Sequence, residues 1–72
     1  MEAMVRLGQN VRALRTKMGI SQEELGYRAG IHRTYVSGLE RGIRNATLSV
    51  LCKLARELGC DPADLLEGIK AE

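Results

Sequence analysis

The sequence predicts an all-α fold, a compact five-helix bundle, and three observations lead to this prediction. Apolar residues recur at helical spacing along the chain, capping residues and glycines punctuate them, and only two of the 72 residues are aromatic. A core of Leu, Val, Ile, Ala and Met suits packed helices, whereas β-sandwiches favour aromatic and β-branched residues. A chain this short buries only about 60% of its unfolded surface, so we expect one domain, residues 1–72, around one core.

The first two helices are predicted from periodicity and from their end signals. The apolar face of the first helix has residues spaced by three and four positions: Met4, Leu7, Val11, Leu14 and Met18. Gly19 follows as a helix-ending glycine. The second helix starts at Ser21 with an S-x-x-E capping box, buries Leu25 and Ala29, and ends at Gly30.

The third helix is expected from about Arg33 to Arg41, with Val36 and Leu39 turned inward and Gly42 at its end. An irregular link over residues 43–46 follows. Thr47 then caps a fourth helix that ends at Gly59 and carries one apolar stripe: Leu48, Leu51, Leu54, Ala55 and Leu58.

The fifth helix has a strong start signal, because Asp61 provides the cap and Pro62 takes the first helical position. Leu65, Leu66 and Ile69 form its predicted apolar face. The loops between the five helices are short, as expected for helices that pack side by side.

Charge is distributed unevenly along the chain. Residues 1–45 carry eight Lys or Arg and four acidic residues, a net charge of +4, whereas residues 46–72 carry three and five, a net charge of −2. A basic front half is typical of a protein that binds a polyanion, although solvated helix faces also produce such asymmetry. No apolar run is long enough to cross a membrane, and the first residues lack the basic-then-apolar layout of a signal peptide, so we expect a cytoplasmic protein without a membrane partner.

Enzymatic and metal-dependent functions find no support in the sequence. Cys52 and Cys60 match no zinc or redox spacing, and the chain has a single histidine, His32, so neither a metal nor another cofactor is expected. Paired carboxylates, a phosphate-binding loop and a second catalytic base beside His32 are likewise missing from the sequence pattern. We therefore predict that the protein is not an enzyme.

The segment from residue 21 to 41 has the layout of a helix-turn-helix. Gly26 lacks a side chain where the next helix must approach closely, and Gly30 can adopt the positive φ of the turn. In this motif the second helix enters the major groove of DNA by its N-terminal residues. With Val36 and Leu39 facing inward, the side chains that lead into the groove are Arg33, Thr34 and Ser37.

This segment resembles the Xre, or lambda-repressor-like, helix-turn-helix family, whose five-helix domain corresponds to residues 4–69. Eight positions match the family pattern in register: Gln22, Leu25, Gly30, Val36, Ser37, Leu39, Glu40 and Gly42. Residues 32–45, His-Arg-Thr-Tyr-Val-Ser-Gly-Leu-Glu-Arg-Gly-Ile-Arg-Asn, are most similar to the controller proteins of restriction–modification systems. The resemblance implies a homodimeric, sequence-specific transcriptional regulator that binds double-stranded DNA at a palindromic operator and controls its own promoter.

The resemblance also implies roles for individual residues. Arg33 is the expected principal base reader, able to contact guanine through two hydrogen bonds. A cation at the start of a helix is disfavoured by the helix dipole, and this cost without a partner favours a functional role for Arg33. The remaining expected DNA contacts are Gln22 on a phosphate, Thr34, Tyr35 and Ser37 on base edges or backbone, and Arg41, Arg44 and Asn45 on phosphates. Gly38 departs from the family pattern, because several members have a long polar side chain there, and this shortens the expected reading surface.

Some residues keep a second interpretation. Tyr35 either contacts DNA or packs against the second helix, and Arg44 and Asn45 either contact DNA or only make the loop soluble. The resemblance implies that Arg15 and Glu40 form a structural ion pair rather than an acid–base pair.

A single reading helix covers too few base pairs to be selective in a genome, which favours a symmetric dimer. The predicted dimerisation region is residues 59–70, with Val50, Cys60, Leu65 and Ile69 as interface residues; the alternative is that the apolar residues of the fifth helix only complete the monomer core. No small-molecule effector is expected. The alternative function, from another class, is a helical protein-interaction or antitoxin-like module with the same fold.

Overall fold

The computed structural model describes residues 2–71 and contains five helices in the order expected from the sequence. Their bounds are α1 Glu2–Met18, α2 Gln22–Ala29, α3 Arg33–Glu40, α4 Leu48–Leu58 and α5 Pro62–Leu65. The described residues form no strand and measure 32 × 22 × 21 Å along their principal axes. The prediction of a compact all-α five-helix bundle is confirmed.

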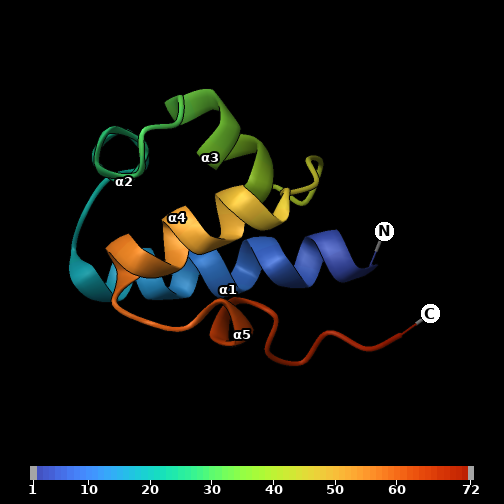
Figure 1. The fold of residues 1–72 in the computed structure, drawn as a ribbon. Coiled ribbons are helices and arrows are strands. Elements are labelled where there is room, and N and C mark those ends of the chain that lie inside the picture. The colour runs from blue at the N-terminus through green and yellow to red at the C-terminus, as the bar shows by residue number, and fades with distance from the viewer. Residues whose placement is uncertain (1, 72) are drawn as a thin grey trace.

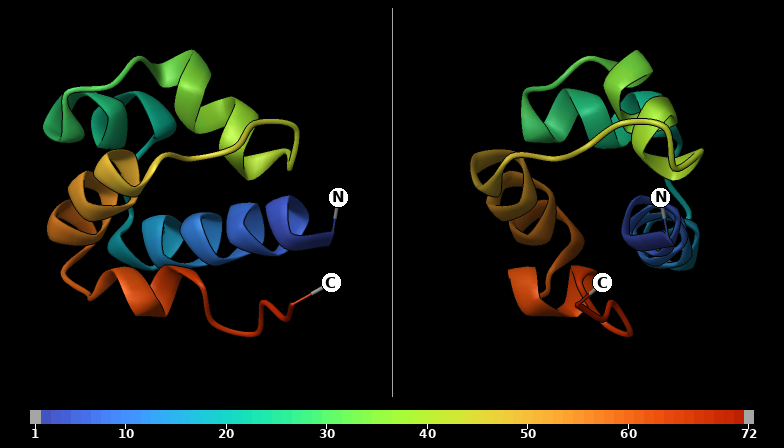
Figure 2. Two further views of the ribbon diagram at one scale, coloured as in Figure 1. Left: turned by 45° about the vertical axis from the view of Figure 1, so that its right-hand side comes forward. Right: turned by 90° about the vertical axis from the view of Figure 1, so that its right-hand side faces the viewer.

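The helices are arranged so that α3 lies at an outer edge of the molecule. α1 and α4 occupy the middle, with α2 and α3 on one side and α5 on the other (Figure 1). α3 packs against α1 and α2, α4 packs against α2 and α1, and α5 closes against α4 and α1. Two further views show that the C-terminal segment runs along α1 on the side away from α3 (Figure 2). One side of α3 is therefore supported and the other faces outward.

One apolar core holds the five helices together. Every helix contributes to it, and its buried members are Leu7, Val11, Leu25, Ala29, Val36, Leu39, Leu51, Leu54, Ala55, Leu58 and Leu65. Gly8 of α1 lies directly against the end of α3, where an added Cβ would overlap the carbonyl oxygen of Leu39 and lie 2.9 Å from that of Glu40. The two helices approach so closely only because Gly8 has no side chain.

The expected cap residues Ser21 and Thr47 do cap their helices, although the Glu24 carboxylate pairs with Arg28 instead of completing the capping box. The side chains of Ser21, His32 and Thr47 accept hydrogen bonds from backbone N–H groups in the first turns of α2, α3 and α4, at 2.9–3.1 Å. At the start of α5, the backbone N–H of Asp61 donates to the Asp64 carboxylate over 2.9 Å. These local interactions explain why the starts of the helices could be predicted from sequence.

Three apolar residues expected on inward faces are instead exposed. Met18 is at the last residue of α1 and is 42% exposed, because no neighbouring helix extends that far. Leu48 is 73% exposed, since it lies in the first turn of α4 at the margin of a stripe centred on Leu51, Leu54 and Leu58. Leu66 is 43% exposed because α5 ends at Leu65.

Leu65 corrects one of the interface predictions. Its side chain is completely buried between α5 and the rest of the core, so it has no surface to offer a second chain. The backbone around it is also held, because the Asn10 amide donates to the carbonyl oxygens of Leu65 and Glu67 over 2.9 Å each. Leu65 is a core residue, and the prediction that it lies in a dimer interface is wrong for this fold.

Candidate nucleic-acid interface

The turn between α2 and α3 has the geometry that the sequence predicts. Gly30 has φ 73° and ψ 31°, a left-handed conformation that glycine adopts without steric cost. A Cβ on Gly26 would lie 2.7 Å from the carbonyl oxygen of Ile31 and 3.3 Å from the backbone nitrogen of Arg33. Gly26 therefore allows the turn and the first residue of α3 to fold back against α2.

The outward side of α3 presents polar side chains beginning at its first turn. Arg33 and Thr34 are exposed and Ser37 is half-buried, whereas Val36 and Leu39 are fully buried. His32 caps the helix through Nδ1, which accepts from the Thr34 N–H and also lies 2.8 Å from the Thr34 hydroxyl. The first turn of α3 is thus ordered with its polar side chains directed away from the core.

Arg33 has a partner that the sequence analysis did not identify. One terminal guanidinium nitrogen of Arg33 lies 3.7 Å from the Glu23 carboxylate, and both side chains are mostly exposed. An exposed ion pair of this length contributes about 0–1 kcal/mol at most. Glu23 therefore restrains Arg33 only weakly, and the guanidinium can exchange it for a ligand.

A partly buried polar cluster ties α1, α2 and α3 together behind this surface. Arg15 and Glu40 form a two-pronged ion pair, with Nε to Oε2 at 2.6 Å and Nη2 to Oε1 at 2.9 Å. Gln22 donates its amide to the same carboxylate over 3.0 Å, and Arg15 also donates to the carbonyl oxygen of Ile20. The structural ion pair expected from the resemblance is present.

The ionisation of Glu40 reflects this cluster. Burial disfavours the charged carboxylate, but the hydrogen bonds from Arg15 and Gln22 and the nearby positive charge outweigh burial, so the pKa of Glu40 lies below its usual range. The hydrogen bond to Glu40 likewise raises the pKa of Arg15. Because a side-chain amide has two N–H groups, Gln22 keeps one donor for a further acceptor such as a phosphate.

The loop after α3 brings a second group of polar residues to the same edge. Arg41, Arg44 and Asn45 are exposed. Tyr35 is half-buried and contacts this loop: its hydroxyl donates to the carbonyl oxygen of Asn45 over 2.9 Å, and the Arg44 guanidinium carbon lies 4.8 Å from its ring centroid. Cations therefore stand at both ends of α3, Arg33 at the start and Arg41 and Arg44 beyond the end.

Two exposed residues are Tyr27, which was given no role from the sequence, and Leu48, which was expected on an inward face. Tyr27 is 83% exposed on α2, one turn after Glu23. It is two positions from each of the inward residues Leu25 and Ala29, which places it on the opposite side of the helix and could have predicted its exposure. Leu48 was assigned to the core from periodicity alone. Of the remaining predicted interface residues, Val50, Cys60 and Ile69 are partly buried against the core.

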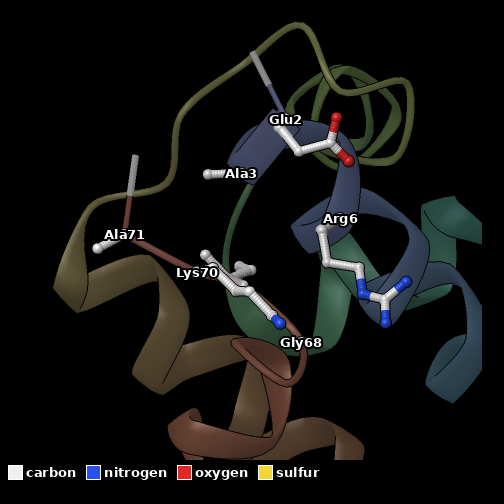
Figure 3. A pocket seen from close by; sticks show the side chains of 7 residues that line it. Glu2, Ala3, Arg6, Gly68, Lys70 and Ala71 are labelled. Carbon is white, nitrogen blue, oxygen red and sulfur yellow. The ribbon is translucent and has the colours of Figure 1, made fainter.

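A shallow hollow lies between the start of α1 and the C-terminal segment (Figure 3). Its charged lining residues are Glu2, Arg6 and Lys70, and none of its seven lining residues is a histidine, cysteine, serine or threonine. Across residues 2–71, no three His, Cys, Asp or Glu side chains are grouped so as to hold a metal ion. None of the described helices is long and apolar enough to span a membrane. The surface of α3 is thus the principal candidate site.

Comparison with known proteins agrees with this geometry. Residues 11–65 match the helix-turn-helix family. The chain is 46% identical over 61 residues to the control protein C.BamHI of Bacillus amyloliquefaciens, which covers 83% of this chain and 75% of that protein. The crystal structure of the restriction-modification controller protein C.AhdI from Aeromonas hydrophila superposes with a TM-score of 0.88 at 45% identity, covering 90% of this chain and 98% of that one. The P22 c2 repressor, crystallised with a synthetic operator, superposes with a TM-score of 0.81 at 34% identity, covering 86% and 94%.

Proposed function

This chain belongs to the Xre-like helix-turn-helix family, and on that premise we propose that it is a sequence-specific DNA-binding transcriptional regulator that controls a restriction–modification system. The outward surface of α3 is its reading surface, and double-stranded DNA is its ligand. A relative of the same fold was crystallised with operator DNA, and the controller proteins are similar over most of this chain.

The observation that carries the proposal is the exposure of Arg33 and Thr34, with the half-buried Ser37 beside them, along a helix whose opposite side is fully buried. Arginine matches the paired acceptors O6 and N7 of guanine in the major groove, and the short hydroxyl side chains can approach base edges. The proposed phosphate contacts, which would set the register of the reading helix, are Gln22 at the start of α2 and Arg41, Arg44 and Asn45 beyond the end of α3. Binding energy thus comes from phosphates and selectivity from α3.

The direct test is to select bound duplexes from a random pool and then compare Arg33→Ala with wild type on the selected site and on random DNA. We expect a loss of about 1–3 kcal/mol on the selected site and a relaxed preference at one base position, because the bidentate contact is removed. Arg56→Ala is the matched control: this arginine is similarly exposed, with 71% of its side chain accessible against 64% for Arg33, but it lies on α4. Equal losses for Arg33→Ala on both DNAs would refute the assignment of Arg33.

If the wild-type protein shows no affinity for any duplex at moderate salt, the proposed function is wrong, and the result supports the alternative of a protein-interaction module with the same fold. If it binds, the selected sequence should recur upstream of the gene that encodes the protein, as autoregulation requires. Selected duplexes that share no consensus sequence would exclude a sequence-specific regulator.

A symmetric dimer is the second part of the proposal. The proposed contacts are three half-buried residues, Val50 of α4 and, farther along the chain, Cys60 and Ile69. The exposed Leu48 of α4 is added to them. We expect sedimentation at micromolar concentration to show a dimer, and Ile69→Asp to give a folded monomer with weak affinity for the selected site. A wild-type monomer that binds a palindromic site one to one would overturn the dimer.

A further inference from the structure

Gly38 is buried although it lies on the outward side of α3. It follows Thr34 by one helical turn, so the two residues share a face. The side chain that covers it is Arg44, from the loop after the helix. An ideal Cβ on Gly38 would lie 3.2 Å from Nε, 3.4 Å from Cβ and 3.7 Å from Cδ of Arg44. The arginine stem therefore lies along the space that a side chain at position 38 would occupy.

Tyr35 holds Arg44 from a second direction. The guanidinium carbon of Arg44 lies over the tyrosine ring, 4.8 Å from its centroid, a distance typical of a cation–π contact. The Tyr35 hydroxyl donates to the carbonyl oxygen of Asn45, the residue after Arg44, which holds the backbone of the loop as well. Across residues 2–71, no hydrogen bond or ion pair occupies the N–H groups of this guanidinium, so they are available to a ligand.

Arg41 provides a contrast within the same loop. It is exposed at the end of α3, and within residues 2–71 its side chain makes no hydrogen bond or ion pair. A loop arginine that only neutralises a phosphate needs no defined position, because phosphates attract it from many directions. Arg44, in contrast, is held by two residues of the reading helix, Gly38 and Tyr35.

We propose that Gly38 is a specificity-determining position, because its missing side chain seats Arg44 on the outward face of α3, where Arg44 reads a base edge alongside Arg33. This inference rests on the proposed function and assigns Arg44 to base readout in place of a phosphate contact. A pre-positioned guanidinium loses little conformational freedom on binding, and its planar donors match guanine O6 and N7. Arg44 of the loop thus supplies the polar side chain that position 38 of the reading helix lacks.

The test compares variants of Arg44, Arg41 and Gly38 with wild type on the selected site and on random duplex by fluorescence anisotropy. Arg44→Ala should lower the preference for the selected site over random DNA about tenfold or more and relax one base position that differs from the position relaxed by Arg33→Ala. Arg44→Lys should bind random DNA like wild type but lose the same preference, because an ammonium cannot make the planar two-donor contact. Arg41→Ala, the matched control, should weaken both DNAs alike and lower the salt slope by about one.

Gly38→Ala tests the seat itself. The backbone of Gly38 is helical, so alanine fits the helix and the melting temperature should not fall. The added methyl group requires the Arg44 side chain to shift by a few tenths of an ångström, so the preference for the selected site should fall in the same direction as in Arg44→Ala but by less. The double variant Gly38→Ala/Arg44→Ala should lose no more preference than Arg44→Ala alone. If Gly38→Ala fails to fold, the Lys and Ala variants of Arg44 decide the matter.

The inference is overturned if Arg44→Ala weakens both DNAs equally, if Arg44→Lys keeps the full preference, or if the two substitutions at 38 and 44 reduce preference additively. Any of these results, together with a selective loss for Arg33→Ala, leaves the proposed function standing and removes only the role of Gly38 and Arg44. A wild-type protein without any sequence preference refutes both.

Discussion

Replacing Arg15 with methionine removes the cation from the polar cluster behind α3. The two side chains of the Arg15–Glu40 pair are only 12% and 2% exposed, so in Arg15→Met the Glu40 carboxylate loses its cation without gaining water. Breaking a buried pair in this way costs about 3–5 kcal/mol. We expect about 3 kcal/mol here, because Gln22 still donates to Glu40.

For a domain of this size the expected loss is large. At roughly 0.05–0.15 kcal/mol per residue, total stability lies at about 4–11 kcal/mol. With about 4–8 °C per kcal/mol for domains of this size, the melting temperature should fall by about 12–24 °C. Urea denaturation followed by far-UV circular dichroism measures the free energy of unfolding directly.

Arg28→Met is the matched control, because Arg28 and Glu24 form an ion pair of nearly the same length, 2.7 Å between Nε and Oε2. Those two side chains are 41% and 44% exposed, and exposed pairs one turn apart on a helix contribute only about 0.3–0.5 kcal/mol. The double variant Arg15→Met/Glu40→Met should recover much of the loss, since no buried charge remains. Equal effects of Arg15→Met and Arg28→Met, or additive losses in the double variant, would refute the reasoning.

The same pair predicts a pH dependence of defined sign. The pKa of Glu40 is lowered in the folded protein, so its stabilising contribution is present above the unfolded value of about 4.3 and is lost as pH falls through the folded pKa. In Arg15→Met, burial without the cation should raise that pKa. The stability difference between wild type and variant should therefore be greatest near neutral pH and shrink toward about pH 4. A difference that stays constant between those limits would contradict the assigned cause.

Three further predictions concern packing and the backbone, each measured by urea denaturation. Gly8→Ala should destabilise by about 3 kcal/mol although alanine is the better helix former, because the new methyl group would overlap the Leu39 carbonyl oxygen; a stabilised variant would mean that α1 and α3 are farther apart. Leu65→Ala should cost about 2–5 kcal/mol and Leu66→Ala less than about 1 kcal/mol, and similar costs would contradict the buried position of Leu65. Gly30→Ala should cost about 1–2 kcal/mol because φ is 73°, and an unchanged stability would argue against the left-handed turn.

The helices and their order could be predicted from sequence because their signals are local. A cap such as Ser21 bonds to an N–H three residues away, and a glycine such as Gly30 acts through its own backbone angles. The periodicity of Leu51, Leu54 and Leu58 identifies the inward side of α4 in the same way. None of these inferences needs to know where another helix lies.

The long-range pair of Arg15 and Glu40 was expected only through the resemblance to a known family. The two residues are 25 positions apart, and no periodicity or capping rule connects them. The outward direction of Arg33 and Thr34, in contrast, followed from the inward positions Val36 and Leu39 on the same short helix.

What the sequence determined by itself is the helical frame, the turn at Gly30 and the polar face of α3. Only the tertiary structure decided that Leu65 is core while Leu48 is exposed, and that Arg44 covers Gly38. An apolar residue is buried only if a neighbouring element reaches it, and helix ends extend beyond their neighbours. A loop arginine can lie across a helix only where the helix leaves space. In the sequence Gly38 indicated only that a side chain is missing, whereas in the fold the side chain of Arg44 lies in that space.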